Sequence, residues 1–289
     1  VLYVATGEDY FQEAQRSVRS LKRHYPELPA TLLTDEPRES TLFDVVEVIQ
    51  DPLYTWGDKI HCLLRSSYDR TLFLDTDTVV CGELDPVYDI LDEFELAVAE
   101  DPYRETEPVD VPDAYPEYNT GVIAYRQTEA VHRLIEVWGQ HHFQGHRTAP
   151  NPGIAGDQPA FRKASYETAV NMTVLPTEYN CRYPFAGAIE QDVAILHGRV
   201  PNPDRVAERL NEETGVPRVF HQTLSGVSIQ SFDWRPWLIR LLIYRFRRDL
   251  RQRGPVTAVK RAAKTLVETA KKNRNSKTHI EKDDKIQNE

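Results

Sequence analysis

Short apolar runs alternate with longer amphipathic segments along the first half of the chain, and this alternation restricts the possible folds more than any other feature. Strand-like runs occur within residues 2–5, 30–37, 44–50 and 71–80. Segments such as residues 10–26 and 58–69 instead carry apolar residues at helical spacing. Strands that alternate with helices predict an α/β fold with a mainly parallel sheet, covered by helices on both faces.

An acidic pair in TLFLDTDTVV is the most unusual feature of these runs. Asp75 and Asp77 interrupt a stretch that is otherwise apolar, with Leu74 before them and Val79 after them. Where a strand ends, two carboxylates two residues apart can reach the same divalent cation. Mg²⁺ and Mn²⁺ prefer oxygen ligands and often share them with substrate phosphates. The pair therefore predicts a metal site at the carboxyl edge of the sheet. The alternative is that the two acids are turn residues that cap the next element.

The charge of the chain is distributed unevenly. Residues 1–232 hold 38 acidic and 19 basic side chains, a balance of −19, and residues 233–289 hold 7 and 16, a balance of +9; together they give the net charge of −10. We therefore expect one large domain over residues 1–232 and a basic, amphipathic helical segment over residues 233–272. Residues 273–289 contain few apolar side chains and are expected to be disordered.

Other features argue against a membrane-spanning, secreted or disulfide-bonded protein. The sequence has no run of 18 apolar residues and so predicts no transmembrane helix. Its first residues have the pattern of a strand and not of a signal peptide, which favours a cytoplasmic location. Cys62, Cys81 and Cys181 lack the paired spacing of a zinc site or a disulfide framework, and we expect three buried or inert thiols.

Several motifs, in a fixed order over roughly residues 1–200, resemble those of nucleotide-sugar glycosyltransferases with the GT-A fold. More narrowly, they resemble family 8, the retaining group that includes glycogenin and bacterial lipopolysaccharide galactosyl- and glucosyltransferases. VLYVATGEDYF is similar to the strand and turn that contact the nucleobase, and DKIHCLLRSSYDRTLFLDTD to the lysine helix that leads to the metal-binding acids. YNTGVIAYR, GDQPAF, LPTEYN and ILHGR resemble later motifs of the family. The resemblance implies a Rossmann-like, mixed sheet.

The resemblance also implies roles for individual residues. Asp75, Asp77 and His197 would bind Mn²⁺ or Mg²⁺ together with the diphosphate of the donor. Catalytic roles would fall to Lys59, as a contact to phosphate or sugar, and to Asp157 and Gln158 at the donor sugar. Asp157 also has the position of a helix N-cap. The other donor-binding residues would be Ala5, Thr6, Tyr10, Thr76, Asn119, Thr120, Gly121 and Gly198.

One motif of the family is missing. The late His-Gly of the family is followed by Lys-Pro-Trp, which contacts the diphosphate, whereas this chain continues HGRVPNPDRVAERL. Arg199 or Arg205 is a candidate replacement for the lysine, and His221 is a second candidate for the third metal ligand. The difference leaves open the family-8 assignment and the retention of anomeric configuration. An inverting enzyme would need a carboxylate base, such as Glu117 or Asp157.

Together with the resemblance, these observations imply a metal-dependent hexosyltransferase, expected to be retaining, with a nucleotide-sugar donor, expected to be a UDP-sugar, and a glycan, lipid-linked or protein acceptor. Two alternatives are a nucleotidyltransferase that makes such donors and a non-catalytic adaptor that binds sugar nucleotides or glycans. A nucleotidyltransferase would need a glycine-rich loop with Lys or Arg after the first strand, which ATGEDYF lacks. The acceptor site is expected in the loops over residues 102–118 and 139–155.

The basic segment combines apolar side chains with clustered arginines in DWRPWLIRLLIYRFRRDLRQR. A helix of this kind over residues 234–272 can lie on an anionic membrane surface, which would make the protein peripheral to the cytoplasmic membrane. It can also pack on the acidic domain. Nucleic acid is not an expected partner, and the sequence predicts no oligomeric state.

Overall fold

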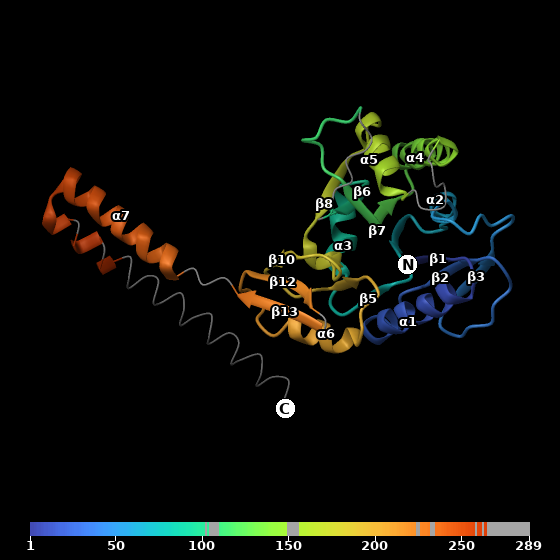
Figure 1. Cartoon of the computed structure of the whole chain (residues 1–289), viewed down its shortest axis with the longest axis horizontal. Coiled ribbons are helices and arrows are strands. Elements are labelled where there is room, and N and C mark those ends of the chain that lie inside the picture. The colour runs from blue at the N-terminus through green and yellow to red at the C-terminus, as the bar shows by residue number, and fades with distance from the viewer. Residues whose placement is uncertain are drawn as a thin grey trace. The chain divides into compact units, whose positions relative to one another are not determined.

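The computed structural model describes residues 1–101, 103, 110–148, 156–223, 226–231, 235–257, 259–261, 263 and 264 (Figure 1). The chain divides into two units, and the boundary between them lies between Ser231 and Phe232.

A seven-stranded sheet forms the centre of the first unit (Figure 1). Its strand order is β3 (Val45–Val48), β2 (Thr31–Thr34), β1 (Leu2–Ala5), β4 (Arg70–Leu74), β7 (Tyr118–Arg126), β6 (Leu96–Glu100) and β8 (Met172–Leu175). Neighbouring strands are parallel except at β7, which runs antiparallel to both β4 and β6. Strands β1 to β4 therefore end at one edge of the sheet, where Asp75 directly follows β4.

Helices cover both faces of this sheet because successive side chains of a strand point to opposite faces. Tyr3, Leu72 and Leu74 pack in one core, and Leu2 and Phe73 pack in the other. The first core contains residues of α1 (Glu8–His24), α3 (Asp85–Asp89) and η1 (Ile90–Asp92). The second contains residues of α2 (Gly57–Leu63), α4 (Glu129–Thr148) and α5 (Gln158–Glu167).

The chain leaves the central sheet at the acidic pair. Its next strand, β5 (Thr78–Val80), belongs to a second sheet, in which it pairs antiparallel with β11 (Ile195–His197). The third strand of that sheet, β9 (Cys181–Arg182), runs parallel to β11. In this register Thr78 lies opposite His197. The loop that holds both acids is thus fixed between two sheets, beside the strand that ends at His197.

A third sheet contains β10 (Gly187–Ile189), β12 (Arg218–Thr223) and β13 (Gly226–Ser231), which pair antiparallel. Apolar residues of α6 (Pro203–Leu210) pack with this sheet. The fully buried Arg218 holds the surrounding turns together. Its guanidinium donates hydrogen bonds of 2.7–3.1 Å to the carbonyl oxygens of Glu190, Gln191, Leu210, Glu213 and Val216.

The described part of the second unit is helical. The long helix α7 (Arg235–Arg253) ends at Gly254, whose φ of 80° is the left-handed conformation that commonly terminates helices. Helical residues follow from Pro255 to Lys264 within the described ranges. Buried Asp249 lies 3.7 Å from Arg261 and 3.9 Å from Arg248, which connects the two helical segments. Among the described residues, no helix combines the length and apolar character needed to cross a membrane.

The predicted architecture, a mixed and mainly parallel sheet flanked by helices, is confirmed. One helix is shorter than predicted, because α2 ends at Leu63 and not near residue 69. The hydroxyl of Ser66 accepts a hydrogen bond from the N–H of Tyr68, a local contact that competes with helix formation. Neither α6 nor the β12–β13 hairpin was expected from the sequence, since neither has a long periodic pattern. The domain limits at 232 and 272 stay predictions, and residues 273–289 lie outside the described ranges.

Replacing Arg218 with alanine should lower the free energy of unfolding by at least about 3 kcal/mol, because five carbonyl groups would lose a charged, buried donor. R218K, with three donors in place of five, should lose less. The exposed R133A on α4 is the control and should change stability by less than about 0.5 kcal/mol. Urea denaturation followed by tryptophan fluorescence measures all three. A loss in R218A no larger than in R133A would contradict the structural role of Arg218.

Candidate active site

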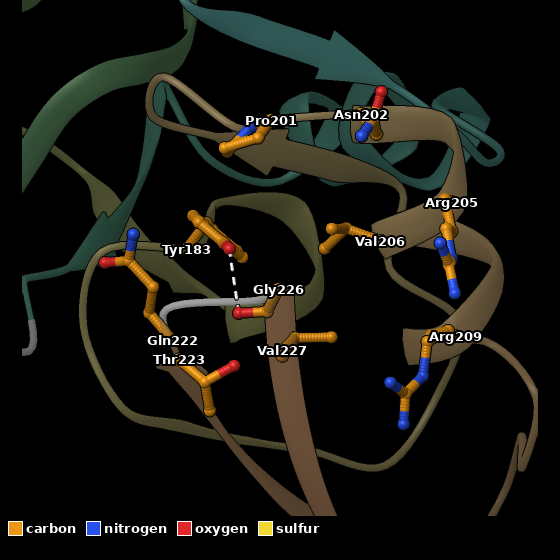
Figure 2. Close-up of a pocket in the computed structure, with 10 residues that line it drawn as sticks. All are labelled: Tyr183, Pro201, Asn202, Arg205, Val206, Arg209, Gln222, Thr223, Gly226 and Val227. Atoms are coloured by element: carbon orange, nitrogen blue, oxygen red, sulfur yellow. Dashed lines mark hydrogen bonds between the residues drawn. The ribbon is translucent and has the colours of Figure 1, made fainter.

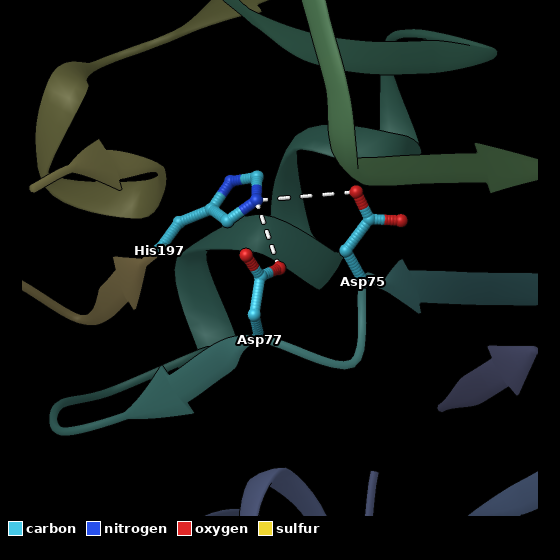
Figure 3. A group of neighbouring side chains, drawn as sticks. All are labelled: Asp75, Asp77 and His197. Atoms are coloured by element: carbon cyan, nitrogen blue, oxygen red, sulfur yellow. Dashed lines mark ion pairs between the residues drawn. The ribbon is translucent and has the colours of Figure 1, made fainter. Parts of the chain in front are cut away.

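Asp75 and Asp77 of the loop after β4 meet His197 at the end of β11 (Figure 3). The Nε2 atom of His197 lies 3.3 Å from Asp77 Oδ1 and 3.9 Å from Asp75 Oδ2. One ligand atom from each residue lies within 4.8 Å of the other two. Carboxylates suit Mg²⁺ or Mn²⁺, and an imidazole favours a transition metal such as Mn²⁺. The side chain of His197 is 5% exposed and that of Asp75 is 31% exposed, so the cluster is open on its acidic side.

Gly121 on β7 provides the space for this cluster. A Cβ atom at this position would lie 2.1 Å from His197 Cε1 and 2.8 Å from Asp75 Oδ2, which is closer than such atoms can approach. The carbonyl of Gly121 also accepts a 2.8 Å hydrogen bond from the N–H of Asp75. A glycine is thus needed where the β7 backbone approaches the imidazole and a carboxylate. The donor set and the space left for it fit a bound divalent cation.

Hydrogen bonds behind the imidazole determine which of its nitrogens faces the acids. The N–H of Gly121 donates to Asn119 Oδ1 (3.1 Å), and Asn180 Nδ2 donates to the same oxygen (2.9 Å). Asn180 Oδ1 is then the acceptor for the N–H of His197 Nδ1, at 2.7 Å. In the neutral imidazole, Nε2 therefore carries the lone pair that faces the two carboxylates, as a metal ligand requires.

The same amide network continues toward the predicted sugar-binding residues. Asn119 Nδ2 donates to Asp101 Oδ2 (2.8 Å) and to Gln158 Oε1 (2.7 Å). Asp101 is buried, and Arg182 Nη1 lies 3.6 Å from its carboxylate. Asn119 thereby links the histidine support to the start of α5, so a shift in one part would disturb the other.

Three residues of this network, Asp101, Asn180 and Arg182, were missed by the sequence analysis. Asp101 directly follows β6, so the reasoning applied to the acids after β4 would have found it. Asn180 lies inside the quoted motif LPTEYN, in which no residue received a role. Arg182 carries no recognisable signal, because its place depends on how β9 pairs with β11.

Lys59 lies inside the site, between two carboxylates. Its Nζ atom is 2.9 Å from Asp157 Oδ2 and 3.4 Å from Asp75 Oδ1, and it donates to Thr120 Oγ1 at 3.1 Å. Burial acts to lower the pKa of Lys59, but the two carboxylates outweigh it and raise the pKa. The ammonium group therefore stays charged and joins the cluster of Asp75, Asp77 and His197 to the start of α5. A direct contact from Lys59 to phosphate or sugar stays a prediction.

Asp157 occupies the N-cap position of α5, but its side chain forms no capping hydrogen bond. The carboxylate instead accepts a 2.6 Å hydrogen bond from Thr120 Oγ1 and pairs with Lys59. Burial acts to raise the pKa of Asp157, and these two partners outweigh it and lower the pKa. The buried indole of Trp138 donates to the Asp157 carbonyl at 2.9 Å and fixes the backbone. The side chain thus belongs to the site and not to the helix end.

The two acids after β4 differ in their affinity for protons. Burial raises the pKa of Asp75, and Lys59 and His197 offset this only in part. For Asp77, burial is outweighed by a hydrogen bond from His197 in its protonated form and by the positive charges of that imidazolium and of Arg199, so that before a cation replaces the Nε2 proton the pKa falls to about 2. Asp77 is therefore an ionised ligand over the whole neutral range.

The predicted base and ribose contacts lie at the end of β1 and the start of α1. Ala5 is buried, and Thr6 Oγ1 donates to Asp58 Oδ2 at 3.0 Å. Tyr10 is 48% exposed and can offer its ring to a ligand. Their contact with a nucleotide stays a prediction.

Arg199 lies between this region and the metal cluster. It donates to Glu13 Oε1 at 2.8 Å, and its guanidinium lies 6.0 Å from the centre of the Tyr10 ring. Glu13 also accepts a 3.0 Å hydrogen bond from Thr76 Oγ1. The N–H of Gly198, whose φ is 113°, bonds the Asp77 carbonyl at 3.1 Å. These contacts place a cation beside the acidic loop, on the side of α1.

Two candidates named from the sequence lie elsewhere. His221 is exposed on β12, and its Nδ1 atom faces the carbonyl oxygen of Gln222 at 3.2 Å. Arg205 is exposed on α6 and lines a different cavity. His197 is therefore the histidine that meets the two acids, and Arg199 is the arginine whose charge acts on Asp77.

Comparison with solved structures identifies the fold. The chain matches the glycosyltransferase GlyE of Streptococcus pneumoniae with a TM-score of 0.50 and 16% identity, over 70% of this chain and 55% of GlyE. It matches the galactosyltransferase LgtC, solved in complex with donor and acceptor sugar analogs, with a TM-score of 0.50 and 13% identity, over 73% of this chain and 94% of LgtC. No protein-family model and no curated protein sequence matches the chain. The predicted GT-A glycosyltransferase fold is confirmed.

Replacing Gly121 with alanine should weaken Mn²⁺ binding at least tenfold, because the new methyl group would displace His197 or Asp75. The control is G145A, at a helical glycine whose added Cβ would meet no atom within 4 Å. Isothermal titration with MnCl₂ measures the affinity, and circular dichroism checks that both variants are folded. Equal Mn²⁺ affinity in folded G121A and in G145A would refute the crowding argument.

Proposed function

We propose that this chain is a metal-dependent glycosyltransferase that transfers a hexose from a nucleotide diphosphate sugar, with UDP as the nucleotide. The observation that carries the proposal is the cluster of Asp75, Asp77 and His197 at the carboxyl edge of the sheet of a glycosyltransferase fold. The acceptor of the hexose would be a glycan, a lipid-linked sugar or a protein.

The residues around the cluster suit the parts of such a donor. Tyr10, Ala5 and Thr6 would bind the base and ribose, and Arg199 would bind the diphosphate in place of the lysine of the missing motif. Asn119, Thr120 and Gln158 would face the sugar. When bound, Mn²⁺ or Mg²⁺ supplies positive charge to the departing diphosphate. Lys59 adds a fixed cation on the opposite side of Asp75, 3.4 Å from its carboxylate.

The state of Asp157 supports retention of anomeric configuration. An inverting enzyme needs a carboxylate base opposite the leaving group. The carboxylate of Asp157 is paired with Lys59, accepts the Thr120 hydroxyl and has a lowered pKa, so it is a weak base. In a retaining reaction the departing diphosphate itself takes part in removing the acceptor proton, and Asp157 serves to hold Lys59 and Thr120.

The alternatives have less support from the structure. A sugar nucleotidyltransferase would need a cationic, glycine-rich loop after β1, whereas β1 is followed here by Thr6 and Gly7 and then by Glu8 and Asp9 in the first turn of α1. A non-catalytic adaptor would not need an ionised acidic ligand and a histidine held in the ligand tautomer. The acceptor loop expected over residues 139–155 is wrong for residues 139–148, which belong to α4. Residues 102, 104–109 and 149–155 of the expected acceptor loops lie outside the described residues.

Release of sugar from UDP-glucose, UDP-galactose and UDP-N-acetylglucosamine, with Mn²⁺ or with EDTA, tests the proposal. We expect hydrolysis or transfer from one donor with Mn²⁺ only, and a loss of at least 100-fold in D77N. D89N, an exposed acid on α3, is the control and should keep full activity. Full activity in D77N would contradict the role of the acidic pair. A wild-type protein that shows neither turnover nor Mn²⁺-dependent UDP binding would refute the proposed function.

The second unit supports a location at the cytoplasmic membrane surface. Arg245, Arg247, Arg248 and Arg251 are exposed on α7, and so are Ile243, Tyr244 and Leu250. A basic residue near an anionic leaflet contributes about 1 kcal/mol to binding. Such a location would bring the site close to lipid-linked or envelope acceptors.

Flotation with vesicles tests this location. The full chain should float with vesicles that contain 30% phosphatidylserine, a composition on the order of that of anionic leaflets, and should stay in the soluble fraction with phosphatidylcholine alone. Replacing Arg245, Arg247, Arg248 and Arg251 with glutamine should abolish flotation. Equal flotation of the variant and the wild-type protein, or none of either, would refute the location.

A further inference from the structure

A cavity of about 690 Å³ lies between α6 and the β12–β13 hairpin, outside the metal cluster (Figure 2). Two basic residues and no acidic residue occur among those that line it: Tyr183, Pro201, Asn202, Arg205, Val206, Arg209, Gln222, Thr223, Gly226 and Val227. Figure 2 shows Arg205 and Arg209 along α6 on one side, and Gln222 and Thr223 on β12 across the opening. The Tyr183 hydroxyl donates to the Gly226 carbonyl at 2.9 Å and fixes the floor between them.

The two arginines have no partner among the residues that the structure describes. Arg205 and Arg209 are four residues apart and therefore lie on one face of α6, where like charges repel each other. Within the described part of the chain, neither guanidinium forms an ion pair or a hydrogen bond. Two adjacent, uncompensated guanidinium groups that line a cavity without carboxylates favour a negatively charged ligand.

In a neighbouring cavity, by contrast, the arginines contact other side chains. That cavity, of about 890 Å³, is lined by Asp77 and by several basic residues. Each arginine there has a described partner: Arg16 and Arg199 contact Glu13, Arg19 contacts Gln15, and Arg23 contacts Asp204. Three of these arginines thus pair with a carboxylate and Arg19 contacts an amide, whereas the described residues offer no such partner to Arg205 and Arg209.

The two cavities share a wall. Pro201 lines both, and it belongs to the loop that runs from His197 to the start of α6. Asn202 follows it with a φ of 52°, a left-handed conformation that costs a residue other than glycine about 1 kcal/mol or more. This turn places Asn202 at the rim of the arginine cavity. A ligand in the cavity would lie one loop away from the metal ligand His197.

We infer that the cavity binds an acidic group, a phosphate or a carboxylate, on the acceptor of the proposed transfer, and in this respect the inference rests on the proposed function. The fork of a guanidinium matches either group with paired hydrogen bonds. Asn202, Gln222 and Thr223 add neutral donors and acceptors for hydroxyl groups, and Val206 and Val227 offer an apolar wall to a sugar ring. The acceptor class is therefore an acidic glycan or a sugar phosphate.

Protection of individual arginines from phenylglyoxal tests this site without any sugar transfer. The probes are inorganic phosphate, glycerol 1-phosphate and glucuronic acid, with glycerol and glucose as neutral counterparts, all in EDTA so that the metal cluster carries no cation. Modification of Arg205 and Arg209, measured by peptide mass spectrometry, should slow at least fivefold with a charged probe and remain unchanged with its neutral counterpart. The exposed Arg65 and Arg133 should show no protection.

Titration calorimetry with the most protective probe provides the affinity. R205Q/R209Q should bind at least tenfold more weakly than the wild-type protein, whereas R65Q/R133Q, which removes the same charge elsewhere, should bind equally. Stronger protection by glycerol 1-phosphate than by glucuronic acid assigns the phosphate, and the reverse assigns the carboxylate. No selective protection, or equal affinity in R205Q/R209Q, would overturn the site.

A transfer assay tests the link to the acceptor. R205Q/R209Q should keep the wild-type rate of donor hydrolysis in the absence of acceptor, and its KM for an acidic acceptor should rise at least tenfold relative to a neutral one. An unchanged ratio would overturn the acceptor assignment. A wild-type protein that lacks donor turnover would refute the proposed function instead, and arginine protection would still report on the anion site.

Discussion

The close approach of the β7 backbone to the end of β11, at Gly121, is the constraint on which the rest of the site depends. Only because this residue has no Cβ can His197 and Asp75 lie side by side. The carbonyl of Gly121 accepts a hydrogen bond from the N–H of Asp75, and its own N–H donates one to Asn119. Gly121 therefore positions both Asp75 and the amide that supports the His197 network. Beyond this contact the loop after β4 leaves the central sheet, and β5 pairs with β11.

The charge of the site explains why a divalent cation fits it. Asp75, Asp77 and Asp157 are three buried or half-buried acids, and Lys59 is the ammonium that contacts two of them. With His197 neutral, three negative charges and one positive charge leave a balance of −2. Repulsion between such carboxylates is large in a partly desolvated site, and burial already raises the pKa of Asp75. A divalent cation between Asp75 and Asp77 would offset the excess and present its open side to a diphosphate.

Much of the fold was predictable because it depends on local patterns. The alternation of strand and helix is visible in short windows of sequence and was predicted correctly. The acids after β4 are visible there too, and their role as metal ligands stays a prediction. Other features depend on residues far apart in the chain. The choice of His197 over His221, the need for Gly121 and the relay through Asn180 follow from how β7 and β11 approach each other, which no periodicity encodes. The arginine pair on α6 looks like ordinary surface charge until its cavity and its lack of partners are seen.

A crystal structure grown with MnCl₂ and UDP, with anomalous diffraction collected at the manganese edge, would show whether Asp75, Asp77 and His197 hold the metal ion. We expect one anomalous peak within metal-ligand distance of Asp75, Asp77 and His197 Nε2, with the diphosphate on the open side toward Arg199. An anomalous peak elsewhere, or none at this cluster while UDP is bound, would contradict the proposed metal site.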